Sequence, residues 1–96
     1  MITVWTNGCF DLLHPGHIEL FKVGKSLGDK LIVGINSDMS IKRIKGESRP
    51  IIEEDSRAKQ LAAIEFIDAV ILFNEDTPHN LISSINPDII LSLIHI

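Results

Sequence analysis

The chain has 96 residues, so a single domain with one modest hydrophobic core is expected. Its formal net charge of −4 argues against a general binder of nucleic acid or of anionic membranes. No apolar run reaches the roughly 18 residues that a membrane span needs, and the N-terminus lacks the features of a signal peptide. The single cysteine, Cys9, cannot form an internal disulfide. These features favour a soluble cytoplasmic protein.

Apolar segments typical of strands alternate with segments typical of helices along the chain. Strands are expected at residues 2–6, 30–36, 69–73 and 88–93. Helices are expected at residues 15–27, 53–66 and 77–85, and a basic loop at residues 40–50. The second strand, KLIVGIN, is apolar almost throughout, as strands covered on both faces are. This order predicts an α/β fold with a Rossmann-like, doubly wound parallel sheet.

The stretch TNGCFDLLHPGH lies where the first strand should turn into the first helix. Pro15 suits the first helical position, which makes His14 the N-cap and His17 the third residue of the helix. Ligands of doubly wound sheets bind beyond the carboxyl ends of the strands, so this turn should face the ligand crevice. Free N–H groups and the helix dipole favour anions there. Two imidazoles at the same place predict a phosphate site, which would also hold charge that grows on a reacting phosphoryl group.

Residue chemistry alone leaves other interpretations of this stretch open. A histidine at a helix start is more often a surface cap than a catalytic group. Paired histidines also ligate metals, but no third histidine stands beside them, and no metal site is expected. Cys9 is interpreted as a packing residue, because nothing near it is arranged as a Cys-His nucleophile pair. The structural alternative for Asp11 is a loop cap.

The string GCFDLLHPGH resembles the H-x-G-H signature of the nucleotidyltransferase superfamily, in its cytidylyltransferase-like branch. The resemblance continues in order through LGDKLIVGINSD, IKGESRPI, SR and FNEDTP, as far as about Leu91. Within the superfamily the chain is most similar to the adenylyltransferases that make ADP-heptose from heptose 1-phosphate. A single H-x-G-H string would be weak evidence, whereas ordered blocks over most of the chain are strong.

The resemblance implies a reaction between ATP, bound with Mg²⁺, and a sugar 1-phosphate. The sugar phosphate attacks the α-phosphorus of ATP, pyrophosphate leaves, and no covalent enzyme intermediate forms. Because family members commonly pair, a homodimer or larger homo-oligomer is expected, with neither nucleic acid nor a membrane as partner. A glycerol-3-phosphate cytidylyltransferase is the alternative among enzymes. A nucleotide-binding fragment without turnover is the alternative from another class.

The resemblance also assigns roles to individual residues. Catalytic roles fall on His14, His17, Lys45 and Arg57. Contacts with the nucleotide fall on Asn7, Gly8, Cys9, Phe10, His14, Gly16 and His17. Contacts with the sugar phosphate fall on Asp11, Asp38, Lys42 and Arg49. Because Arg57 shares a helical stripe with apolar residues, a side chain that merely snorkels is the alternative for it. Asp68 is expected to order the turn into the third strand.

The end of the chain departs from the family pattern. Family members follow the fourth strand with a lysine-glycine-aspartate-aromatic block, whereas this chain ends in LSLIHI. That ending looks like a translated adapter sequence. We therefore expect one nucleotidyltransferase domain over residues 1–96, with a fold that is incomplete at its C-terminus and a non-native tail at residues 91–96.

Overall fold

The computed structural model describes residues 1–91, so the predicted tail and the end of the predicted fourth strand lie mostly outside the described residues. The strands are β1 (Thr3–Gly8), β2 (Lys30–Asn36), β3 (Ala69–Phe73) and β4 (Ile89–Ile90). The helices are α1 (Pro15–Ser26), α2 (Asp38–Lys45), α3 (Glu54–Ala62) and α4 (His79–Ile85).

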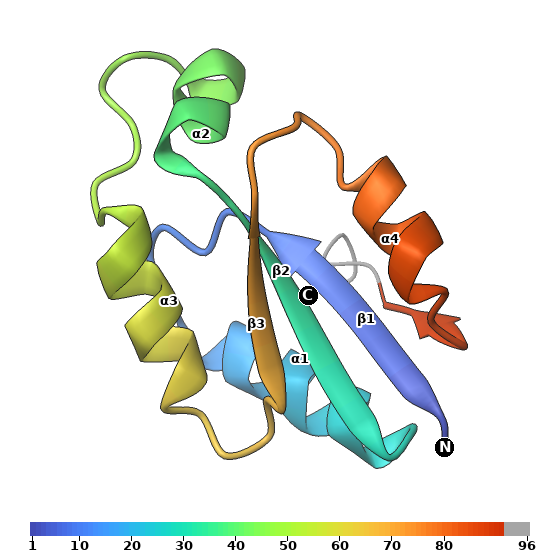
Figure 1. The fold of residues 1–96 in the computed structure, drawn as a ribbon. Helices are drawn as coiled ribbons and strands as arrows, with labels where there is room; N and C mark the ends of the chain where they lie inside the picture. The colour runs from blue at the N-terminus through green and yellow to red at the C-terminus, as the bar shows by residue number, and fades with distance from the viewer. Residues whose placement is uncertain (92–96) are drawn as a thin grey trace.

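The described strands form one parallel sheet in the order β3-β2-β1-β4 (Figure 1). The chain steps from β1 to β2 to β3 in one direction and then returns past β1 to β4. Helices α1 and α3 share one face of the sheet and α4 covers the other, as right-handed crossovers require (Figure 1). The predicted doubly wound α/β fold is therefore confirmed. The strand order reverses at β1, which makes its carboxyl end the switch point where ligands bind in such sheets.

The core on the face under α1 and α3 forms from alternate residues of β2. Leu31, Val33 and Ile35 are fully buried there and belong to one cluster with Phe21 of α1 and Leu61 of α3. Side chains of a strand alternate between faces, so the residues between these three point toward the opposite layer. This two-sided burial explains why β2 reads as a continuous apolar run.

The opposite face is filled by the fully buried indole of Trp5 in β1. Its ring lies over Gly34 of β2, where an added Cβ would come within 2.4 Å of a ring carbon. Phe73 of β3 closes the same space, with a ring atom 3.3 Å from that Cβ position. Glycine at position 34 is thus required by close packing of an aromatic ring.

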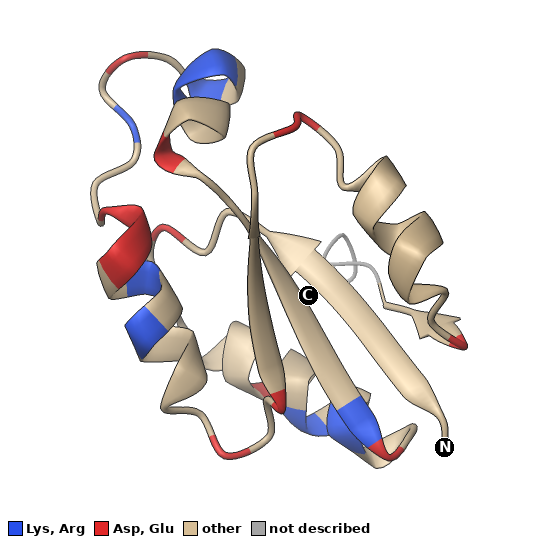
Figure 2. Cartoon of the chain, viewed as in Figure 1, with Lys and Arg blue, Asp and Glu red and all other residues tan. Residues whose placement is uncertain are grey.

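The expectation of a basic loop was wrong for residues 40–45, which lie in α2. Ser37 caps this helix, since its hydroxyl oxygen accepts a hydrogen bond from the Ser40 amide at 3.2 Å. Ile41 anchors the helix through a fully buried side chain. Lys42, Arg43 and Lys45 occupy the last turn, where the helix dipole favours cations (Figure 2).

The other element boundaries differ modestly from the prediction. β1 extends to Gly8, two residues beyond the predicted end, and so carries the chain directly into the turn before α1. α3 ends at Ala62, because the chain then makes tight turns that bury Ile67. Asp68 has the expected ordering role, since it accepts from the Leu31 amide at 2.7 Å. None of the described helices is long and apolar enough to cross a bilayer.

Candidate functional site

The two histidines of the H-x-G-H string form a reciprocal cap at the start of α1. His14 is the N-cap, and its Nδ1 accepts a hydrogen bond from the Gly16 amide at 3.0 Å. Nδ1 of His17 accepts from the His14 amide at 3.2 Å. An imidazole nitrogen that accepts carries no proton, so each neutral ring must hold its proton on Nε2. Each ring therefore keeps one N–H donor that the backbone does not use.

Packing fixes the orientation of the two rings. The centroids of His14 and His17 are 4.0 Å apart, and the rings of Phe10 and His17 form a T-shaped pair with centroids 5.4 Å apart. Burial, and secondarily the nearby His14, lowers the pKa of His17 below its ordinary value of 6.5. His17 is consequently neutral at pH 7 and acts as an uncharged donor.

The backbone of Phe10 has a positive φ of 50°, a left-handed conformation that costs a non-glycine residue on the order of 1–2 kcal/mol. The Phe10 side chain is buried and also packs against Phe21 of α1, with ring centroids 5.4 Å apart. Such a conformation persists only where the surroundings over-determine it. The turn before α1 is therefore held in one shape by contacts from other elements.

A cleft of about 320 Å³ opens beside these rings. It brings residues of the β1–α1 turn together with two basic residues from α2 and the loop that follows it. Its lining consists of Cys9, Phe10, Asp11, Leu12, His17, Lys45 and Arg49. A cleft with three basic or donor side chains at a helix N-terminus suits a phosphate group. The ring of His14 lies next to His17, at the wall of an adjoining apolar hollow.

Asp11 lies in the cleft wall, and its carboxylate faces protein donors. Its oxygens accept from the Ile51 amide at 2.8 and 2.9 Å, from the Ile52 amide at 2.8 Å, and from Arg49 Nη1 at 3.1 Å. Burial opposes ionisation, but these hydrogen bonds from Ile52, Ile51 and Arg49 outweigh it and hold the pKa of Asp11 below 3.8. Asp11 thus fastens the loop after α2 to the β1–α1 turn. Its predicted contact with the sugar phosphate stays a prediction.

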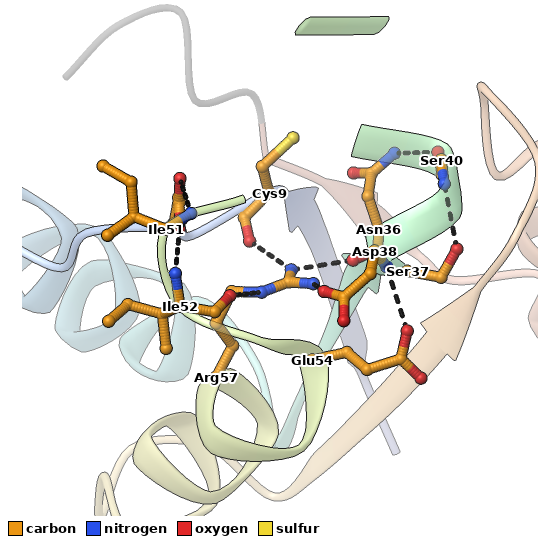
Figure 3. A network of polar contacts seen from close by, with 10 residues as sticks. Cys9, Asn36, Ser37, Asp38, Ser40, Ile51, Ile52, Glu54 and Arg57 are labelled. Atoms are coloured by element: carbon orange, nitrogen blue, oxygen red, sulfur yellow. Dashed lines mark hydrogen bonds and ion pairs between the residues drawn. The ribbon is translucent and has the colours of Figure 1, made fainter. Parts of the chain in front are cut away.

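Arg57 is fully buried on α3, and its guanidinium is surrounded by acceptors from the protein (Figure 3). Nε donates to the Ile52 carbonyl at 2.9 Å, and Nη1 donates to the carbonyls of Cys9 and Asn36 at 2.7 Å each. Nη2 donates to Asp38 Oδ1 at 2.8 Å. The sequence led us to expect Arg57 to face the ligand. In the structure the guanidinium bonds three backbone carbonyls and Asp38, whose carboxylate is 30% exposed. The predicted catalytic role of Arg57 and the predicted substrate contact of Asp38 stay predictions.

The remaining predicted site residues fall into two groups. Asn7 and Gly8 lie at the carboxyl end of β1, and Gly16 lies in the first turn of α1, where its amide donates to His14. Lys42 is exposed on α2 and does not line the cleft. Trp5 was not predicted to take part, yet its Nε1 donates to Asn7 Oδ1 at 2.9 Å and so orients that amide.

Ser40 is a second residue that the sequence did not single out. Its hydroxyl accepts from Asn36 Nδ2 at 3.0 Å (Figure 3). The same hydroxyl donates to the Glu75 carbonyl at 3.0 Å. The end of β2 is thereby tied to the segment after β3. The N-cap signal of Ser37, three residues earlier, would have placed Ser40 in the first turn of a helix.

Comparison with known families identifies the domain. The family profile described as cytidylyltransferase-like matches residues 5–95. The chain belongs to the cytidylyltransferase-like family. The predicted resemblance is confirmed, and the chain is a nucleotidyltransferase-type domain of this family.

Curated relatives in the cytidylyltransferase-like family are much longer than this chain. The bifunctional protein HldE of Methylobacillus flagellatus is 55% identical over 87 residues, which are 91% of this chain and 18% of that protein. HldE of Campylobacter jejuni is 58% identical over 88 residues, which are 92% of this chain and 19% of that protein. The chain thus spans less than a fifth of the length of these relatives.

A solved structure agrees with the family assignment. The crystal structure of the lipopolysaccharide core biosynthesis protein from Thermoplasma volcanium superimposes with a TM-score of 0.83 at 39% sequence identity. The match covers 94% of this chain and 72% of that one. The α/β fold is therefore shared with an experimentally determined structure.

Proposed function

We propose that this domain transfers AMP from ATP to a sugar 1-phosphate and releases pyrophosphate, with D-glycero-D-manno-heptose 1-phosphate as the acceptor and ADP-heptose as the product. The observation that carries the proposal is the pair of imidazoles at the N-terminus of α1, whose Nδ1 atoms accept backbone hydrogen bonds and leave Nε2 to serve a ligand. A phosphoryl group placed there would receive two oriented donors and the positive end of the helix dipole.

In the proposed reaction a phosphate oxygen of the sugar attacks the α-phosphorus of ATP in line. The bond from that phosphorus to the bridging oxygen breaks, and the electron pair leaves with pyrophosphate. Charge grows on the non-bridging oxygens, where His14 and His17 would donate. Lys45 and Arg49, on the other wall of the cleft, would neutralise the phosphates that leave.

Magnesium enters this scheme as part of the MgATP substrate. Among residues 1–91, no group of three histidine, cysteine, aspartate or glutamate side chains lies close enough to hold a metal ion. Mg²⁺ in phosphoryl-transfer sites is usually bound by substrate phosphates and water with only one or two carboxylates. The charge brought by MgATP is then balanced chiefly by the basic side chains of the cleft.

The choice of acceptor is supported by the relatives. Two HldE proteins share more than half of the aligned residues with this chain, and the solved neighbour is named for lipopolysaccharide core biosynthesis. The sequence blocks TNGCFD and EDTP also favour the heptose enzymes over the glycerol-3-phosphate cytidylyltransferases.

The test is pyrophosphate release by the chain with ATP or CTP, each offered with heptose 1-phosphate or glycerol 3-phosphate. We expect release to be fastest with ATP and heptose 1-phosphate. A preference for CTP with glycerol 3-phosphate would replace the proposal with the cytidylyltransferase alternative. If titration calorimetry detects MgATP binding but no pair gives release, the chain is a nucleotide-binding module without turnover.

A further inference from the structure

Arg57 joins three stretches of the chain to α3: the β1–α1 turn, the junction between β2 and α2, and the residues just before α3. Its acceptors are the carbonyl of Cys9 after β1, the carbonyl of Asn36 at the end of β2, the carboxylate of Asp38 at the start of α2, and the carbonyl of Ile52 before α3 (Figure 3). Three of these are backbone groups, so the bonds fix the path of the chain. A planar guanidinium presents its donors in a rigid fork, which a lysine ammonium does not reproduce.

Each joined segment carries part of the cleft. The Cys9 carbonyl directly precedes Phe10, whose strained backbone aims its ring at His17. Asp38 begins the helix that ends with Lys45. Arg57 itself does not line the cleft that these groups surround.

The segment before α3 is held from two sides. The carbonyl of Ile52 accepts from Arg57, while the amides of Ile51 and Ile52 donate to Asp11. Arg49, which lines the cleft, precedes them in the chain and contacts the same Asp11 carboxylate. The loop after α2 is therefore fastened to the β1–α1 turn by Asp11 and to the strand ends by Arg57.

We propose that Arg57 is a positioning residue, which holds the β1–α1 turn, the start of α2 and the loop before α3 in the arrangement that binds phosphate, and does not itself contact the ligand. The inference rests on the proposed function only in naming MgATP as that ligand. A direct contact would require the guanidinium to break bonds with the protein and leave a fully buried position.

Two substitutions distinguish positioning from direct contact. Asp38→Ala removes the only charged acceptor that Arg57 has among residues 1–91. If Arg57 bound phosphate, this change would free the guanidinium and remove a negative charge, so MgATP would bind more tightly. If Arg57 positions the loops, MgATP should bind about tenfold more weakly or worse, because the loss of a charge-assisted hydrogen bond loosens the start of α2. Binding is measured by titration calorimetry.

Arg57→Lys keeps the positive charge but removes the planar set of N–H donors that the guanidinium presents. Amide hydrogen exchange of Ile51 and Ile52 in the ligand-free chain should quicken about tenfold or more, while that of Val33 in β2 stays unchanged. The matched controls are Asp76→Ala and Arg43→Lys, because Arg43 and Asp76 form an exposed ion pair of the same type on α2 and the segment after β3. Neither control should change exchange at Ile51 and Ile52.

Tighter MgATP binding by Asp38→Ala, or unchanged exchange at Ile51 and Ile52 in Arg57→Lys, would overturn the inference. If Arg57→Lys does not fold, the exchange comparison is made on Asp38→Ala against Asp76→Ala. If the unsubstituted chain binds no MgATP, the proposed function fails, and the exchange measurement still decides the role of Arg57.

Discussion

Replacing His14 by asparagine should separate the two tasks of this side chain. Nδ1 of His14 caps α1 by accepting from the Gly16 amide, while Nε2–H is left for a phosphoryl group. Asparagine is among the best N-cap residues, and its side-chain oxygen would accept the same type of hydrogen bond. It has no donor where Nε2 lies. His14→Asn should therefore keep the cap and lose the contact with the reacting phosphate, whereas His14→Ala should lose both.

The magnitudes follow from these two losses. A lost N-cap costs about 1 kcal/mol, which lowers the melting temperature of a domain of this size by about 4–8 °C. A lost donor to the transition state costs on the order of 3 kcal/mol, or about 100-fold or more in turnover. His14→Asn should thus melt within a few degrees of the unsubstituted chain, and His14→Ala should melt lower, while turnover falls by a similar factor in both.

The assay combines thermal denaturation with pyrophosphate release from ATP and heptose 1-phosphate. Lys22→Ala, an exposed position on α1, serves as the control and should change neither quantity. Full turnover in His14→Asn would refute the assignment of Nε2–H to the phosphoryl group. A His14→Asn variant as unstable as His14→Ala would refute the capping role.

Three further outcomes are expected. The pKa of His17 lies below 6.5, so its ring is neutral in both the folded and the unfolded chain well above that pH, and calorimetry should find constant MgATP affinity between about pH 7 and about pH 8.5. The unfolding free energy should decline as the pH falls below 6.5, because the unfolded chain takes up the proton more readily. Asp11→Asn should lower the unfolding free energy measured with urea at pH 7 by about 1–3 kcal/mol, since one acceptor oxygen is replaced by an amide donor. Because the pKa of Asp11 is held below 3.8, the difference in unfolding free energy between the variant and the unsubstituted chain should shrink as the pH falls below that value. A difference that grew would contradict the account. Gly34→Ala should destabilise the chain by about 2 kcal/mol or more, because the added Cβ would lie 2.4 Å from the buried Trp5 ring. If the variant and the unsubstituted chain melt at the same temperature, the ring can move aside.

The sequence was sufficient to predict the strand–helix alternation and the place of the histidines. Both rest on local signals, since Pro15 at the first helical position fixes His14 as the N-cap and His17 as the third residue. α2 was missed because its charged last turn looked like a loop. In the sequence, only Ser37 as a candidate N-cap indicated the start of this helix. The structure adds that Ile41 is its one deeply buried apolar residue.

The partners of Arg57 could not have been predicted in the same way. Its place on an apolar stripe left a side chain that snorkels to solvent as the alternative, whereas the structure buries Arg57 fully. Three of its acceptors, however, are backbone carbonyls, which no residue type reveals. The carbonyls of Cys9 and Asn36 are 48 and 21 positions away in the sequence, so only the folded topology brings them together.

The polar residues around the cleft, at the carboxyl ends of the strands, fall into two kinds according to their exposure. Lys45 and His14 are exposed and keep donors that a ligand can reach, whereas Asp11 and Arg57 are 6% and 0% exposed and bind other parts of the protein. A phosphate site needs both kinds, because donors at loops and helix ends bind weakly unless their backbone is held in advance. Substitution of an exposed donor should therefore reduce turnover, with little loss of stability unless the same side chain also caps a helix, as His14 does. Substitution of a buried residue such as Asp11 or Arg57 should reduce turnover and folding stability together, since the hydrogen bonds that stabilise the fold also position the donors.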